Sequence, residues 1–387
     1  MRRLIDYAAG QPTDRRVSVA HDPTGMRAGA STDVGPPVRL AGLDGLRGIA
    51  VLLVVLSHIG WPGFGPTGST GVTVFFTLSG FLITALLLEE HDRKGRIDLG
   101  AFWVRRGLRL FPALWLFVIL AGVVAVGVGI MTILGFLRTA AAPLFYIANF
   151  VDPQTLGPFR HTWSLAVEEQ FYLIWPGLMI IAARIPRRRL PIVLAIATVL
   201  ACWWRLHQGL APVDYGSKLV YEAMIHRTDT CAFSLLAGAT LSAALRAGLR
   251  LPRLNDIASD VVCASLVVVP LALGGLVGLS GVTGPVFATA CALALIVAAA
   301  GRRAGMLQTS SLRALGRISY GWYLWHYLGV WLVHHFSSYR DAPLAWGLAV
   351  AVSSLLLAAV SWRIVERPIL RLKRRFERSS IAAVVPN

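Results

Sequence analysis

Long apolar runs separated by short polar loops dominate the hydrophobic pattern of this chain. A helix that spans a bilayer needs about 20 mostly apolar residues, and ten runs approach that length. We predict spans at 41–60, 71–88, 110–130, 163–183, 190–207, 228–245, 258–277, 283–300, 318–336 and 343–364. The pattern therefore predicts an all-α fold, a polytopic transmembrane bundle of about ten helices.

One further apolar stretch, 131–150, contains Arg138 and Pro143. If it does not cross the membrane, six segments share one side: the N-terminal tail, the loops 89–109, 184–189, 246–253 and 301–317, and the C-terminal tail. They hold most of the 37 Lys and Arg residues, and the positive-inside rule makes that side the cytoplasm. We therefore expect 131–150 to be a re-entrant or interfacial segment at the outer face, and both termini to be cytoplasmic.

Composition indicates a multi-pass protein of the cell membrane, embedded in the lipid bilayer. Hydrophobic residues make up 56% of the chain, charged residues only 15%, and the mean hydropathy is +0.63, which is too apolar for a water-facing surface. The net charge of +17 is spread over short clusters and forms no single basic face, so nucleic acid is not an expected partner. The cysteines sit singly in apolar segments without metal or redox spacing, which favours packing roles and predicts no metal site.

The two ends of the chain differ from this pattern. Residues 1–38 are polar and rich in Gly, Pro, Ser and Thr, so we expect a disordered basic N-terminal tail without a cleavable signal peptide. The membrane domain is expected over 39–378, followed by a short C-terminal tail, 379–387.

The first span carries two ionisable residues, Arg47 and His58. Eleven steps of about 100° return to nearly the same helix face, with a rise of roughly 16 Å. Ionisable groups inside a span usually line a path or a site, so function is favoured. The alternative is an interfacial arginine plus a histidine that bonds neighbouring backbone.

Two further groups of charged residues suggest chemistry. Arg106 and Arg109 are three positions apart where the third span begins, so they share a helix face suited to phosphates; simple anchoring is the alternative. Glu168 and Glu169 lie roughly 7–10 Å into the fourth span, a depth comparable with His58. One is expected to face the bundle interior, either to orient a histidine or to bridge helices.

Other polar residues are candidates for structural or acceptor-side roles. Ser79 lies in the middle of the second span, where small residues favour close packing, and the sequence shows no base beside it for a nucleophile. Arg227 and Asp229 lie together at the outer end of the sixth span, as expected of an ion pair. His326 lies among aromatic residues of the ninth span, a setting that favours packing.

Seven segments then occur in a familiar order: LDGLRGIAVLLVVLSH, GVTVFFTLSGFLIT, FWVRRGLRLFP, HTWSLAVEEQFYLIWP, HRTDTCAFSLLAG, ISYGWYLWH and SWRIVERP. Over about residues 40–375 the chain resembles the acyltransferase 3 family of membrane O-acyltransferases. The resemblance implies transfer of an acyl group, acetyl or another short chain, from cytoplasmic acyl-CoA to a hydroxyl. It also implies that His58 is the essential residue of the first span and that Arg106 and Arg109 lie on the donor side.

A finer resemblance concerns the acceptor. The stand-alone domain, its length and its Ala, Gly, Val and Arg bias are similar to actinomycete enzymes that acylate macrolide antibiotics, for example at the 3-hydroxyl of 16-membered lactones. The expected acceptor is therefore a macrolide, with a cell-surface polysaccharide or glycolipid as the alternative.

The resemblance suggests a mechanism without a bound cofactor. The arginines, Arg47 included, hold acyl-CoA as a co-substrate, and His58 acts as general base on the acceptor hydroxyl; a transient acyl-histidine is the alternative. A competing class is a proton-coupled transporter in which His58, Glu168 and Glu169 relay protons. A lipid-anchored scaffold would explain none of the buried ionisable groups.

Overall fold

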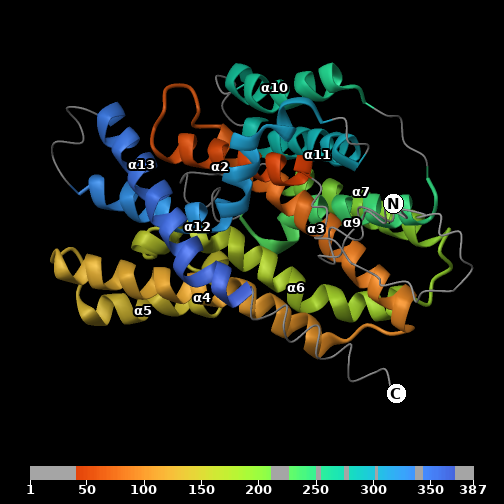
Figure 1. The fold of residues 1–387 in the computed structure, drawn as a ribbon, viewed down its shortest axis with the longest axis horizontal. Helices are drawn as coiled ribbons and strands as arrows, with labels where there is room; N and C mark the ends of the chain where they lie inside the picture. The colour runs from red at the N-terminus through yellow and green to blue at the C-terminus, as the bar shows by residue number, and fades with distance from the viewer. Residues whose placement is uncertain are drawn as a thin grey trace, which may run out of the picture.

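The computed structural model is a bundle of long helices (Figure 1). It describes residues 41–210, 226–249, 254–273, 279–300, 304–335 and 343–370. The helices are α2 (Ala41–His58), α3 (Thr67–Lys94), α4 (Leu99–Gly127), α5 (Ile133–Leu144), α6 (Trp163–Ala182), α7 (Leu190–Leu210), α9 (Thr228–Arg246), α10 (Asp256–Leu273), α11 (Leu279–Ala300), α12 (Ser310–Val333) and α13 (Pro343–Ser361). Short 3₁₀ turns cover Ala148–Phe150, Gly157–Thr162 and Gly305–Gln308, and a π-helical turn, Trp362–Glu366, continues α13. These described residues contain no strand, so the predicted all-α fold is confirmed; the tails 1–38 and 379–387 lie outside them.

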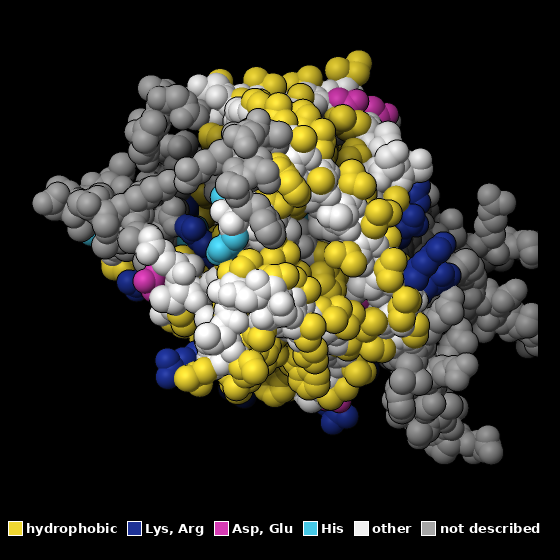
Figure 2. Space-filling view, turned by 90° about the vertical axis from the view of Figure 1, so that its left-hand side faces the viewer, with side chains coloured by type: hydrophobic (Ala, Val, Ile, Leu, Met, Phe, Trp, Pro, Cys, Tyr) yellow, Lys and Arg dark blue, Asp and Glu magenta, His cyan; other side chains and the backbone are white. Residues whose placement is uncertain are grey.

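Within the described part of the chain, eight helical segments are long and apolar enough to cross a membrane: α2, α3, α4, α6 with the turn before it, α7, α9, α11 and α13. Figure 2 shows hydrophobic side chains over much of the described surface on the side that it views, with Lys and Arg confined to small groups. Outward-facing apolar residues such as Val123, Ile196 and Leu356 are more than half exposed, as lipid contact requires. α10 and α12 coincide with the remaining predicted spans, 258–277 and 318–336, so ten crossings with cytoplasmic termini stay a prediction.

The apolar stretch 131–150 forms α5 and the turn after it. α5 has 12 residues, which at about 1.5 Å per residue extend about 18 Å, well short of the hydrocarbon core of about 30 Å. The side chain of Thr132 caps the helix by accepting a hydrogen bond from the Gly135 backbone N–H, and α5 packs back against α4. This geometry agrees with the expectation that the segment does not cross the membrane.

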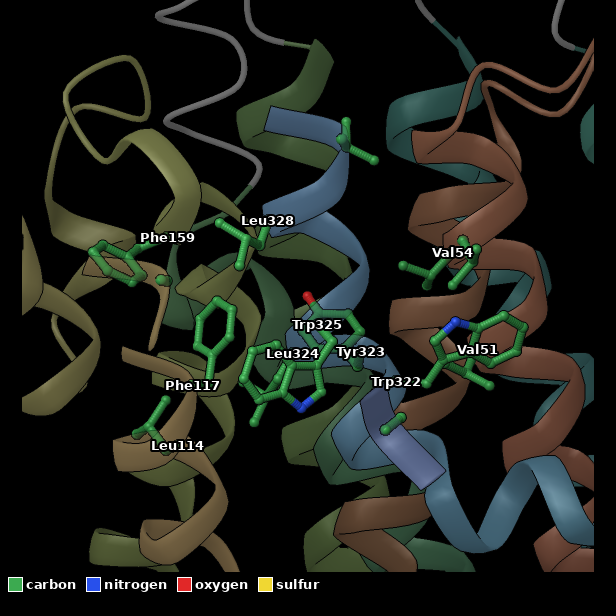
Figure 3. Packing of buried hydrophobic residues seen from close by; sticks show 14 of the residues in the cluster. Val51, Val54, Leu114, Phe117, Phe159, Trp322, Tyr323, Leu324, Trp325 and Leu328 are labelled. Carbon is green, nitrogen blue, oxygen red and sulfur yellow. The ribbon is translucent and has the colours of Figure 1, made fainter. Parts of the chain in front are cut away.

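α12 is the central helix around which the site is built. Its aromatic residues fill the space between α2 and α4 (Figure 3), where Trp322 lies on the side of Val51 and Val54, and Trp325 on the side of Phe117. The rings of Phe117 and Trp325 meet edge to face with centroids 5.5 Å apart. These buried rings exclude water from the core and hold both neighbouring helices on α12.

α2 and α12 touch through their backbones, and this contact requires glycine. A Cβ atom at Gly316 would lie 1.7 Å from the carbonyl oxygen of Asp44, and one at Gly48 would lie 2.2 Å from that of Leu312. No larger residue fits at either position unless the helices separate, since packed interiors hold little spare volume. The glycines therefore set the distance between the two helices, and with it the contact between the side chains farther along them.

Candidate functional site

The last residue of α2, His58, meets His326 of α12. Its Nδ1 lies 3.1 Å from Nε2 of His326, and the two rings are tilted at 38°. His326 is completely buried, and its own Nδ1 lies 2.7 Å from the carbonyl oxygen of Tyr323. A histidine of the first span is thus joined to one of the ninth predicted span.

The hydrogen bonds assign the tautomers of the two neutral rings. A carbonyl oxygen only accepts, so Nδ1 of His326 carries the proton that it shares with Tyr323 and its Nε2 has the lone pair. Nδ1 of His58 must then donate to His326, which leaves Nε2 as the unprotonated nitrogen of His58. This is the arrangement that a general base needs, because the ring is held with its basic nitrogen directed away from the supporting residue.

Sequence reasoning favoured packing for His326 because its neighbours along the chain are aromatic. The structure adds a direct contact with His58, which lies 268 residues away in the sequence. No local sequence pattern can predict a contact between residues so far apart in the chain. A glutamate that orients a histidine was one of two roles considered for Glu168 and Glu169; among the described residues, the side chain that bonds His58 is the imidazole of His326.

A third histidine, His161, completes the cluster and was missed by sequence reasoning. It is 2% exposed, stacks on Tyr327 with centroids 5.0 Å apart, and meets His326 edge to face at 5.5 Å. Neither of its buried ring nitrogens has a hydrogen-bond partner of good geometry in the described part of the chain. The sequence feature that could have identified His161 is its position directly before the fourth predicted span, at the same predicted membrane face as His58.

The glutamates of α6 form a second polar layer, nearer the predicted cytoplasmic side. Glu168 accepts a hydrogen bond of 2.8 Å from the hydroxyl of Ser79. Both Glu168 and Glu169 lie within electrostatic range of Arg106, whose guanidinium stacks over the ring of Tyr172 at 3.9 Å. The sequence around Ser79 supplies no base, and the structure places a carboxylate of α6 beside it that the sequence of α3 does not reveal.

The other candidate arginines lie around this layer. Nε of Arg47 donates to Ser319 of α12 over 3.4 Å, so Arg47 and His58 both contact α12 and the predicted shared face is confirmed. Arg109 is exposed and acts electrostatically on Glu168, Glu169 and Glu366. Arg106 thus contacts Tyr172 of α6, whereas the exposed Arg109 is the stronger candidate for contact with a ligand.

The predicted ion pair at the start of α9 is present. Arg227 donates to both carboxylate oxygens of Asp229, at 3.0 Å and 2.9 Å, and the indole N–H of Trp204 donates to the same carboxylate at 3.1 Å. The ion pair lies at the N-terminus of α9, on the face of the bundle where His58 lies.

Comparison with known proteins identifies the family to which this chain belongs. A family model described as an acyltransferase domain, that of acyltransferase 3, matches residues 40–363. The chain belongs to the acyltransferase 3 family. Its expected place as a multi-pass membrane protein of this family is confirmed.

Relatives in the acyltransferase 3 family include enzymes named for O-acetyl transfer. Peptidoglycan O-acetyltransferase OatA of Listeria monocytogenes is 28% identical over 356 residues, which cover 84% of this chain and 55% of that protein. O-acetyltransferase OatA of Staphylococcus aureus is 29% identical over 355 residues, which cover 86% and 57%. The chain therefore spans little more than half the length of these relatives. No solved structure matches it.

Proposed function

We propose that this protein is a membrane O-acetyltransferase that moves an acetyl group from acetyl-CoA to a hydroxyl of a cell-surface glycan. The observation that carries the proposal is the imidazole pair, in which His326 holds His58 with Nε2 unprotonated. Buried ionisable residues in a span could also serve a transporter. The relatives are named as transferases, which supports the enzyme.

In the proposed reaction, Nε2 of His58 takes the proton of the acceptor hydroxyl while its oxygen attacks the thioester carbonyl. The new C–O bond forms the ester, the C–S bond breaks, and the CoA thiolate leaves with the proton that His58 releases. General base catalysis of this kind typically contributes about 10² to 10⁴ in rate. Arg109, with Arg106 and Arg47, supplies positive charge for the CoA phosphates at the predicted cytoplasmic end.

A glycan is proposed as the acceptor because a relative that covers most of this chain is named for peptidoglycan. The macrolide expected from the finer resemblance has no such support. The predicted orientation also favours a glycan, since His58 ends α2 at the predicted outer face, where cell-surface glycans lie.

The function is tested by incubating the purified protein with isotope-labelled acetyl-CoA and three acceptors: a soluble peptidoglycan disaccharide fragment, a 16-membered macrolide, and water alone. Mass spectrometry should find the labelled acetyl ester on the disaccharide. Ester on the macrolide alone would contradict the glycan acceptor, and no ester on any acceptor would contradict the transferase itself.

A donor-side prediction concerns Arg109. Its replacement by alanine should weaken acetyl-CoA binding by about 10- to 100-fold, because the loss of a charge-assisted hydrogen bond costs about 1.5–3 kcal/mol. Isothermal titration calorimetry with acetyl-CoA measures the effect. Arg138→Ala, at an exposed arginine of α5, is the matched control and should bind normally. An unchanged affinity in Arg109→Ala would assign this residue to membrane anchoring.

Arg106 is a less clean test of the same site. Its buried guanidinium stacks on Tyr172 and acts electrostatically on Glu168 and Glu169, so its removal is also expected to lower stability. A loss of activity in Arg106→Ala would therefore mix donor binding with folding.

A further inference from the structure

A cavity of about 630 Å³ is lined in part by Arg160, the residue that precedes His161 of the histidine cluster. Its wall is formed by the segment around the 3₁₀ turn Ala148–Phe150, by the end of the turn that precedes α6, and by the start of α9. The volume falls within the range of about 300–1,000 Å³ that is typical of small-molecule sites. None of the roles proposed above uses this cavity.

The cavity shares its surroundings with the proposed base. Arg160 and His226 both line it. The charge of Arg160 acts on His58 and on His226, and His58 itself acts on His226. A molecule in the cavity would therefore lie against groups that act electrostatically on His58.

One wall of the cavity is aromatic. Trp163, the first residue of α6, stacks on His226 with centroids 3.9 Å apart and planes at 18°, and the edge of its indole meets Phe76. Burial, together with the positive charge of Arg160, lowers the pKa of His226 to about 3, so its ring is neutral at neutral pH and can both donate and accept a hydrogen bond. Phe150, 68% exposed, adds a second apolar surface at the rim.

Another part of the cavity lining is held in place by an amide and hydroxyl network. Gln170 of α6 donates to the side-chain oxygen of Asn149 over 2.9 Å, Asn149 donates to the hydroxyl of Thr228 over 3.1 Å, and Thr228 donates back to Gln170. Asn149 and Thr228 line the cavity. Because three segments are joined by mutually satisfied bonds, the cavity is preformed and does not depend on a ligand to order it.

We propose that this cavity binds one pyranose ring of the acceptor, with the apolar face of the ring against the Trp163 and His226 wall and its hydroxyl directed to Nε2 of His58. A rigid aromatic surface beside a few fixed polar groups suits a sugar, which has apolar C–H faces and a polar edge. The inference rests on the proposed glycan O-acetyltransferase function and adds the place and the residues that recognise the acceptor.

Steady-state kinetics with the peptidoglycan disaccharide fragment test the cavity. Trp163→Ala should raise the acceptor KM about 10- to 30-fold, as expected for truncation of an aromatic anchor, with the KM for acetyl-CoA unchanged; Trp163→Phe should recover part of the loss. Phe150→Ala should raise the acceptor KM several-fold. Its matched control is Phe145→Ala, 73% exposed and absent from the cavity wall, which should stay within twofold of the unmodified protein.

A binding measurement separates this inference from the function. The His58→Ala protein, which keeps the cavity, should show saturation-transfer NMR signals from the disaccharide fragment, and the added Trp163→Ala or Phe150→Ala change should remove or weaken them. If acetyl transfer to the glycan occurs but neither Trp163 nor Phe150 affects acceptor KM or binding, the cavity proposal is wrong and the function stands. If no glycan is acetylated, the function fails, and loss of the NMR signals in the Trp163 variant still decides whether the cavity binds a sugar.

Discussion

His58→Ala should lower turnover by about 10²- to 10⁴-fold, the usual contribution of a general base, while the protein still inserts and binds acetyl-CoA. The lost interaction belongs to proton transfer in the transition state and not to donor binding, so kcat should fall and donor affinity should not. Rates of ester formation measure the first quantity, and calorimetry with acetyl-CoA measures the second.

Two further variants sharpen the test of His58. His58→Gln keeps a polar side chain but cannot take the proton, so it should fail as well. His335→Ala replaces an exposed histidine that follows α12 and should retain full activity. Near-normal acetyl transfer by a properly inserted His58→Ala protein would overturn the mechanism and assign the imidazole a structural role.

His326→Phe should lower kcat by about 10²-fold with little change in either KM. The aromatic ring fills the buried space, but it cannot accept the Nδ1 proton of His58. An unsatisfied buried donor costs about 1–3 kcal/mol, so the His58 ring is expected to turn, or its proton to move from Nδ1 to Nε2. A protonated Nε2 can no longer act as the base. Turnover and KM for both substrates provide the measurement.

The conservative variant distinguishes positioning from packing. His326→Gln offers an amide oxygen to the Nδ1 proton of His58 and should recover part of the lost kcat. Thermal denaturation of the purified variants checks folding. If His326→Phe and His326→Gln lose activity only in proportion to their loss of folded protein, His326 is a packing residue, as the aromatic sequence around it first indicated.

Much of the helical framework could be read from the sequence. In a bilayer every backbone group must be satisfied within its own segment, so a span is encoded by about 20 neighbouring residues. The expectation that 131–150 does not cross the membrane followed from the placement of basic loops. Helix periodicity is enough to predict the shared face of Arg47 and His58. The ion pair of Arg227 with Asp229 was expected from their closeness in the sequence at the end of a span.

The polar partnerships across the bundle could not be read in the same way. Glu168 was expected near His58 because both lie at similar depths in their helices, yet it bonds Ser79 across 89 residues. Periodicity gives the side of a helix on which a residue lies, but it does not give the neighbouring helix that this side faces. From the sequence, a carboxylate that bonds a serine of α3 could therefore not be told from one that bonds the imidazole of α2.

The sequence alone thus determined the membrane class, the helical segments, the polar face of α2 and the family, because these depend on local composition, period and ordered motifs. Only the tertiary structure decided that His326 supports His58, that Ser79 has a carboxylate beside it, and that Trp163, His226 and Asn149 share a cavity. The physical reason lies in the helix contacts. The backbone approach at Gly48 and Gly316 sets the spacing of α2 and α12, and that spacing decides which distant side chains meet.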